Sequence, residues 1–264
     1  MIARLPALRP AVIVAGMVAG LAVLALPGHP ALTLMLISAA ASVALVYPPA
    51  MIAAVILSVP LQDKLLLPFA GGHVTLTQAS LLALFLGWGA LFWRRRIWLD
   101  AVTWWYAAIM AALVLSLIAM DDRAAWAGEV YRWGVAAAFY LVCRSALRSW
   151  QAIRVALWAM AGAVLAVAAY GLGQFLASAG PDHMMRGGVL RVFGPFGTPN
   201  PFAAYMEMSV PLLLALALAG LHRETRLRIG GGLWVAVSAA AGLGALIIAL
   251  TQSRGGWVGF AAAM

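Results

Sequence analysis

The segment RVFGPFGTPNPF, residues 191–202, lies between two long apolar runs and contains the chain's only asparagine, Asn200. Its glycines and prolines favour defined turns over regular structure. Asn200 followed by Pro201 is typical of a helix N-cap and first turn, so we expect a helix to begin there. A helix N-terminus with Arg191 and Arg186 beside it predicts a site for an anion such as a phosphate. The same residues also fit a purely structural turn and cap.

The composition indicates an integral membrane protein. The chain is 65% hydrophobic and 9% charged, whereas soluble globular domains carry roughly 25% charged residues. Long continuous apolar runs exclude the alternating pattern of a barrel, so we predict an all-α polytopic membrane protein. The single cysteine, Cys143, excludes a disulfide framework and a cysteine-built metal site. The net charge of +9 comes from short arginine clusters between apolar runs, which the positive-inside rule explains more simply than nucleic-acid binding does.

The apolar runs predict about nine to ten transmembrane helices in a single helical domain, residues 1–264. We expect spans at residues 11–26, 31–47, 50–59, 79–93, 101–120, up to about 143, 155–177, 201–221 and 232–250, and the start of another after 254. The first is read as a retained span and not as a signal peptide, because a second apolar run follows at once. Residues 61–78 are expected to form a loop or re-entrant segment. The last run reaches Met264 before it is long enough to span, so we expect this chain to be the N-terminal portion of a longer protein.

The basic residues predict the orientation of these spans. With a cytoplasmic N-terminus, most of them fall on the inner side: Arg4, Arg9, Arg94, Arg95, Arg96, Arg144, Arg148, Arg154, Arg223, Arg226 and Arg228. The others lie outside or near the outer ends of helices: Lys64, Arg123, Arg132, Arg186, Arg191 and Arg254. Residues 191–202 and Arg254 therefore face the same, non-cytoplasmic side.

Arg186, Arg191 and Arg254 are the chief candidate binding residues, because a charge near the mouth of a helical bundle is costly unless it is paired, snorkelling or used. Snorkelling is the simpler explanation for Arg186. Glu207 is expected to point into the bundle and to pair with an arginine. His183 is more simply a loop residue than an acid or base. The sequence has no pattern of metal ligands, no phosphate-binding loop and no dinucleotide fingerprint.

Two motifs carry a resemblance to a known family. They are R-x-x-G-x-F-x-x-P-N-P-x-A-x-Y at residues 191–205 and T-x-S-R-G at residues 251–255. Together they resemble the O-antigen ligase and O-antigen polymerase superfamily, most specifically over residues 186–264. The resemblance implies a multi-pass protein of the bacterial inner membrane with a GT-C-like helical fold. It also implies transfer of a glycan from an undecaprenyl-pyrophosphate carrier to an acceptor at the periplasmic face, with inversion and without a metal or cofactor.

The resemblance also implies roles for particular residues. Arg191 and Arg254, with Arg186, would bind and neutralise the pyrophosphate leaving group. The residues expected to order the site are Gly194, Pro199, Asn200, Glu207 and Ser253. Family members carry a histidine motif in a later periplasmic loop, and the chain's histidines do not match it: His29, His73, His183 and His222. No catalytic residue is identified, and we expect the 264-residue chain to be inactive alone.

Two other functions fit the same sequence. A transporter or flippase for an anionic lipid-linked substrate would use the same arginines, and a non-catalytic membrane scaffold would need none of them. Within the transferase reading, ligase and polymerase differ in the acceptor, lipid A core or a growing polysaccharide, which these residues do not address. A long outward loop containing histidine in the continuing sequence would favour transfer, whereas an inverted repeat of the first half would favour transport.

Overall fold

The computed structural model describes residues 30–264 except 63, 70–71, 90–99 and 120. The described part is mostly helical, as predicted. Its helices are α2 (Pro30–Val46), α3 (Pro48–Ser58), α4 (Leu76–Gly89), α5 (Ala101–Ser116), α6 (Arg123–Ala146), α7 (Trp150–Leu176), α8 (Pro199–Ala219), α9 (Arg223–Ile229), α10 (Gly231–Leu250) and α11 (Arg254–Ala263). The predicted span at residues 11–26 lies outside the described residues.

Two small antiparallel hairpins interrupt the helices. The first pairs β1 (Leu66–Phe69) with β2 (Gly72–Thr75), in the segment that we expected to be a loop or re-entrant stretch. The second pairs β3 (Met185–Arg186) with β4 (Val189–Leu190), within the connection between α7 and α8. Short 3-10 turns lie at Val59–Leu61, Leu117–Ala119, Asp182–Met184 and Gly194–Phe196. The all-α prediction therefore holds for the bulk of the chain and misses these two hairpins, whose backbone groups pair locally between strands.

Three of the described helices are long and apolar enough to cross a membrane. They are α7 with 27 residues, α8 with 21 and α10 with 20. At about 1.5 Å per residue, each reaches the roughly 30 Å of a bilayer's hydrocarbon core. The other apolar helices, α2 to α5, are shorter within the described residues. The structure thus supports a helical membrane protein, whereas the total number of spans stays a prediction.

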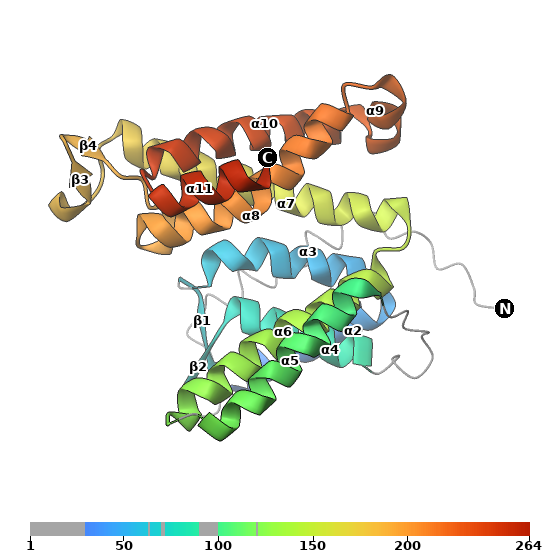
Figure 1. Cartoon of the computed structure of the whole chain (residues 1–264). Helices are drawn as coiled ribbons and strands as arrows, with labels where there is room; N and C mark the ends of the chain where they lie inside the picture. Colours follow the sequence, from blue (N-terminus) through green and yellow to red (C-terminus); the bar gives the residue numbers. More distant parts are fainter. Residues whose placement is uncertain (1–29, 63, 70–71, 90–99, 120) are drawn as a thin grey trace.

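The helices form two bundles (Figure 1). The N-terminal bundle contains α2 to α6, and the C-terminal bundle contains α7, α8, α10 and α11, with α3 packed against α7 between them. In the C-terminal bundle, a core of buried side chains that includes Phe202, Met206 and Val210 lies between α7, α8 and α10. Gly244 of α10 lets the helices approach closely, since a Cβ there would lie 2.5 Å from the Val210 side chain.

The connections define two ends of the C-terminal bundle. At one end, residues 177–198 join α7 to α8, and residues 251–253 join α10 to α11. At the other end, α9 lies between α8 and α10, as Figure 1 shows. We call these the loop end and the α9 end. The candidate binding residues Arg186, Arg191 and Arg254 all lie at the loop end.

Candidate functional site

The connection before α8 is fixed to the bundle by backbone and amide hydrogen bonds. The Val192 amide donates to the Leu250 carbonyl at the end of α10, with an N–O distance of 3.1 Å. The buried Gln174 side chain on α7 holds Gly194 on both sides. Its Oε1 accepts from the Gly194 amide at 2.9 Å, and its Nε2 donates to the Gly194 carbonyl at 3.3 Å. The segment is therefore an ordered part of the bundle, and Gln174 is an ordering residue that the sequence did not single out.

Gly194 occupies a position that other residues cannot take without strain. Its φ is +55°, and a Cβ there would lie 2.9 Å from the ring of Phe202. Phe202 is fully buried, and the Phe196 ring stacks on it with centroids 5.6 Å apart. The turn is thus shaped by the left-handed backbone of Gly194 and by the aromatic side chains beneath it. This places Gly194, predicted to order the site, directly on the core.

Helix α8 begins earlier than the sequence predicted. It starts at Pro199, with Thr198 in the N-cap position and no side-chain capping hydrogen bond. The prediction that Asn200 caps this helix is wrong, because the helix already begins at Pro199, whose ring fixes the φ of a first helical residue. Asn200 lies in the first turn instead. Its Oδ1 accepts a hydrogen bond from Nη2 of Arg191 at 3.5 Å.

Arg191 connects the two helix junctions at the loop end. Besides its contact with Asn200 at the start of α8, its Nε donates to the carbonyl oxygen of Thr251 at 3.2 Å. Thr251 is fully buried at the end of α10. The guanidinium group is therefore held at one point between the two junctions, by partners that come from both sides.

Arg254 is placed by the capped start of α11. Oγ of Ser253, the N-cap residue, accepts from the Gly256 amide at 3.3 Å. Gly256 allows α11 to start against α8, since a Cβ there would lie 2.7 Å from the side chain of Ala203. Arg254 is consequently the first residue of a helix that is packed on α8 and whose positive dipole end faces the same region. The preceding Gln252 has a φ of +51° and also faces this region.

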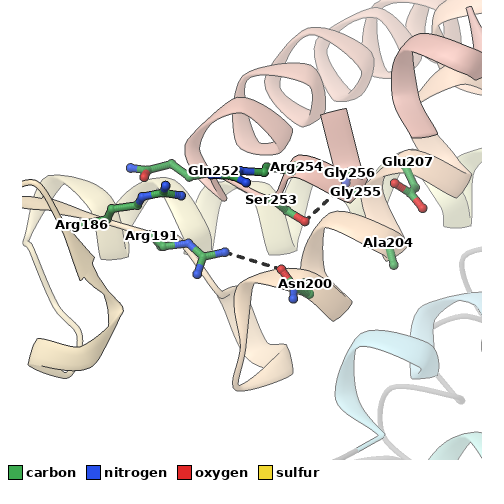
Figure 2. Close-up of a pocket in the computed structure, with 10 residues that line it drawn as sticks. All are labelled: Arg186, Arg191, Asn200, Ala204, Glu207, Gln252, Ser253, Arg254, Gly255 and Gly256. Carbon is green, nitrogen blue, oxygen red and sulfur yellow. Dashed lines mark hydrogen bonds between the residues drawn. The ribbon is translucent and has the colours of Figure 1, made fainter. Parts of the chain in front are cut away.

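An open pocket of about 470 Å³ lies between these elements (Figure 2). It brings together the predicted residues Arg186, Arg191, Asn200, Glu207, Ser253 and Arg254. The other lining residues are Ala204, Gln252, Gly255 and Gly256. The two glycines follow Arg254 at the second motif, whereas the sequence did not single out Ala204 or Gln252. Asn200, Ala204 and Glu207 are spaced i, i+4 and i+7 on α8, so helical spacing from Asn200 points to Ala204. Gly194 and Pro199, also predicted as ordering residues, lie outside the lining and shape the turn before α8.

The charges in the pocket are unequal. Three guanidinium groups face it, from β3, from the turn before α8 and from the start of α11, against the single carboxylate of Glu207. Guanidinium groups are fixed forks of donors that bind phosphate oxygens in pairs. The pocket is therefore suited to an anion, and a phosphate or pyrophosphate fits its donors.

Glu207 does not form the ion pair that we predicted. Among the described residues, the ion pairs are Arg132 with Glu129 and Arg144 with Asp100. The Glu207 carboxylate is directed toward α11, where a Cβ on Gly259 would lie 2.6 Å from its Oε2. The three arginines come from β3, from the turn before α8 and from the first residue of α11, whereas Glu207 lies about two helical turns along α8 from Asn200.

Groups suited to metal binding were not found in the described part of the chain, where no cluster of three or more histidine, cysteine, aspartate or glutamate residues occurs. His183 lies in the short 3-10 turn Asp182–Met184, is exposed, and does not line the pocket.

No family model, curated protein or solved structure matches this chain. A function must therefore be inferred from the pocket and from the sequence motifs that form it.

Proposed function

We propose that this chain belongs to a membrane glycosyltransferase of the O-antigen ligase or polymerase type. It would transfer a glycan from an undecaprenyl-pyrophosphate carrier to an acceptor, either lipopolysaccharide core or a growing polysaccharide. The proposal includes a bacterial inner-membrane location, a cytoplasmic N-terminus, a GT-C-like arrangement of about nine to ten spans and a periplasmic active face. It rests on the motif resemblance and on the pocket that the same motifs build.

The observation that carries the proposal is the convergence of Arg186, Arg191 and Arg254 in one pocket at the loop end. Arg191 and Arg254 belong to two motifs that are far apart in the sequence. Arg191 is hydrogen-bonded to the first turn of α8, and Arg254 comes shortly after the end of α10. Both of these helices are long enough to cross a membrane. A lipid-linked pyrophosphate has its anionic group at this depth, at the boundary between the lipid tail and water. Fixed arginines in that position are suited to hold it.

The proposed role of the arginines is to stabilise the leaving group. In the transfer, an acceptor hydroxyl oxygen attacks the anomeric carbon while the bond from that carbon to the pyrophosphate oxygen breaks. The bonding electrons leave with the pyrophosphate, and the acceptor's proton passes to a base. Negative charge therefore increases on the pyrophosphate, where preorganised guanidinium groups lower the barrier most effectively. The hydrogen bonds from Arg191 to Thr251 and Asn200 supply that preorganisation.

The first experiment measures binding of undecaprenyl pyrophosphate to the purified chain in lipid nanodiscs. Arg191→Ala is expected to weaken binding by about tenfold or more, because each charge-assisted hydrogen bond contributes roughly 1.5–3 kcal/mol. Arg132→Ala is the matched control, since Arg132 is an exposed arginine on α6 paired with Glu129. Equal affinity of the wild type and Arg191→Ala would refute the proposed pyrophosphate site.

Transfer and transport predict different products. In proteoliposomes with a labelled carrier-linked glycan and an acceptor, a transferase breaks the bond between sugar and pyrophosphate, whereas a flippase moves the intact molecule between leaflets. Movement of the intact carrier that depends on Arg191, without release of undecaprenyl pyrophosphate, would replace the proposed activity with transport.

A further inference from the structure

Glu207 lies in the same pocket as the arginines but apart from them. Figure 2 shows Arg186, Arg191 and Arg254 on one side, and Glu207 on the other beside the first turns of α11. Asn200, which is hydrogen-bonded to Arg191, lies on the same face of α8 as Glu207, at the start of the helix. The pocket therefore has a cationic side and, about two helical turns along α8, a carboxylate side.

The carboxylate is placed where it has an unused acceptor. Oε2 of Glu207 is buried and has no hydrogen-bond partner among the described residues. Burying an acceptor without a partner costs free energy, so the position is unfavourable unless a bound molecule supplies a donor. Gly259 provides the space, since a Cβ at that residue would lie 2.6 Å from Oε2. The backbone of α11 thus leaves room for the carboxylate but donates no hydrogen bond to Oε2.

The surrounding charge limits the kind of donor that fits. A cationic ligand group would be repelled by the three guanidinium groups of the same pocket. A neutral hydroxyl donates a hydrogen bond without that repulsion. A ligand that satisfies both sides is therefore an anion joined to a group that bears hydroxyls, which describes a sugar attached to a pyrophosphate.

We infer that Glu207 recognises the sugar that is joined to the pyrophosphate, by accepting a hydrogen bond from one of its hydroxyl groups. This inference rests on the proposed function and adds a specificity residue to it. Arg191 and Arg254 bind the anion that every carrier has, and Glu207 makes the pocket prefer a carrier that is loaded with sugar over one that is bare.

The test compares two probes, undecaprenyl pyrophosphate and undecaprenyl-pyrophosphoryl-N-acetylglucosamine, binding to the chain in nanodiscs. The wild type is expected to bind the sugar-bearing carrier about tenfold more tightly, the effect of one hydrogen bond to a charged group. Glu207→Ala is expected to bind the two probes with equal affinity, because the group that distinguishes the sugar is gone. Glu207→Gln keeps the size of the side chain and an acceptor oxygen, and is expected to retain part of the preference.

A second pair of variants tests the position of the carboxylate. Gly259→Ala is expected to displace the Glu207 carboxylate and to reduce the preference, although Glu207 itself is present. Gly242→Ala on α10 is the control, because a Cβ there has nothing within 4 Å. The preference should be unaffected in that variant.

The possible outcomes separate the two proposals. If the wild type binds both carriers equally, or if Glu207→Ala and Glu207→Gln keep the full preference, the inference about Glu207 is wrong while the pyrophosphate site stands. If the wild type binds neither carrier, or if Arg191→Ala binds both as well as the wild type does, the proposed function itself fails.

Discussion

At the α9 end of the C-terminal bundle, arginines bind groups of the protein itself, whereas at the loop end three arginines line an open pocket. Nη2 of Arg154 on α7 donates to the carbonyl oxygen of Arg228 at 2.7 Å. The Trp150 indole also donates to that carbonyl. The Arg226 guanidinium lies 5.4 Å from the centroid of the Trp234 ring. These contacts fasten α9 to α7 and α10, so their arginines are structural.

The loop end uses the same residue type differently. Arg191 has two partners, both from the helix junctions that frame the pocket, while Arg186 and Arg254 are exposed beside it. The difference lies in the backbone. The α9 end closes with a short helix in which the carbonyl group of Arg228 accepts a hydrogen bond from Arg154 of α7. The loop end closes with turns and with the N-termini of α8 and α11, whose positive dipole ends attract anions.

The largest expected effect comes from a substitution that disrupts the ordered turn at the loop end. Gly194→Ala is expected to lower the free energy of unfolding by about 2–4 kcal/mol, because the substitution combines a left-handed backbone with a clash against Phe202. Gly197→Ala is the matched change: its φ of +73° is also left-handed, but a Cβ there has nothing within 4 Å. That variant should cost only about 1 kcal/mol. Unfolding in detergent measures both, and equal losses would show that Phe202 does not restrict Gly194.

The next prediction compares one arginine from each end. Arg154→Ala should lower the free energy of unfolding by about 1–2 kcal/mol by removing the hydrogen bond to Arg228. Its affinity for undecaprenyl pyrophosphate should stay within about twofold of the wild type's, as expected for a change outside the pocket. Arg254→Ala should do the reverse, with stability within about 0.5 kcal/mol of the wild type and an affinity about tenfold weaker. If both variants lose stability and keep affinity, the two ends do not differ in the way described.

The smallest expected effect concerns Asp100, before α5, which belongs to the N-terminal bundle and pairs with Arg144. A hydrogen bond from the Tyr140 hydroxyl, bonds from Thr103 and the nearby Arg144 lower the pKa of the Asp100 carboxyl from 3.8 to about 2. The stabilisation is therefore fully present above pH 3.8 and is lost as the pH falls toward 2. The melting temperature should decrease over that interval.

The control for this titration is Asp100→Asn, which cannot ionise. Its melting temperature is expected to change less between pH 4 and pH 2 than that of the wild type, an interval set by the two pKa values. Parallel curves for the two proteins would show that Asp100 contributes nothing to acid sensitivity.

Much of the fold follows from local sequence. Apolar runs predicted α7, α8 and α10 within a few residues, since backbone groups in a bilayer must pair within a helix. The hairpin of residues 66–75 was missed because its short strands lie in a semi-polar stretch without a clear two-residue alternation. The start of α8 was misplaced because Pro199 and Asn200 both favour a helix start, and the local sequence does not show at which of the two the helix begins.

The candidate site was only partly predictable. Its three arginines were recognised because a charge near the mouth of a helical bundle is costly unless it is paired or used. The clamp by Gln174 was not recognised, because a single glutamine within an apolar helix has no distinctive spacing. The expected pairing of Glu207 with an arginine failed for a related reason. Spacing along α8 fixes the face on which a side chain lies, but it does not say which neighbouring helix covers that face.

The sequence by itself determined that this chain is helical, suited to a membrane, and basic at defined connections, because these properties depend on composition and on neighbouring residues. Only the tertiary structure decided that Arg191 and Arg254 share one pocket and that Glu207 faces Gly259 instead of either arginine. Those relations depend on how α7, α8, α10 and α11 pack. Packing is set by contacts such as that of Gly244 with Val210, between residues that are far apart in the sequence.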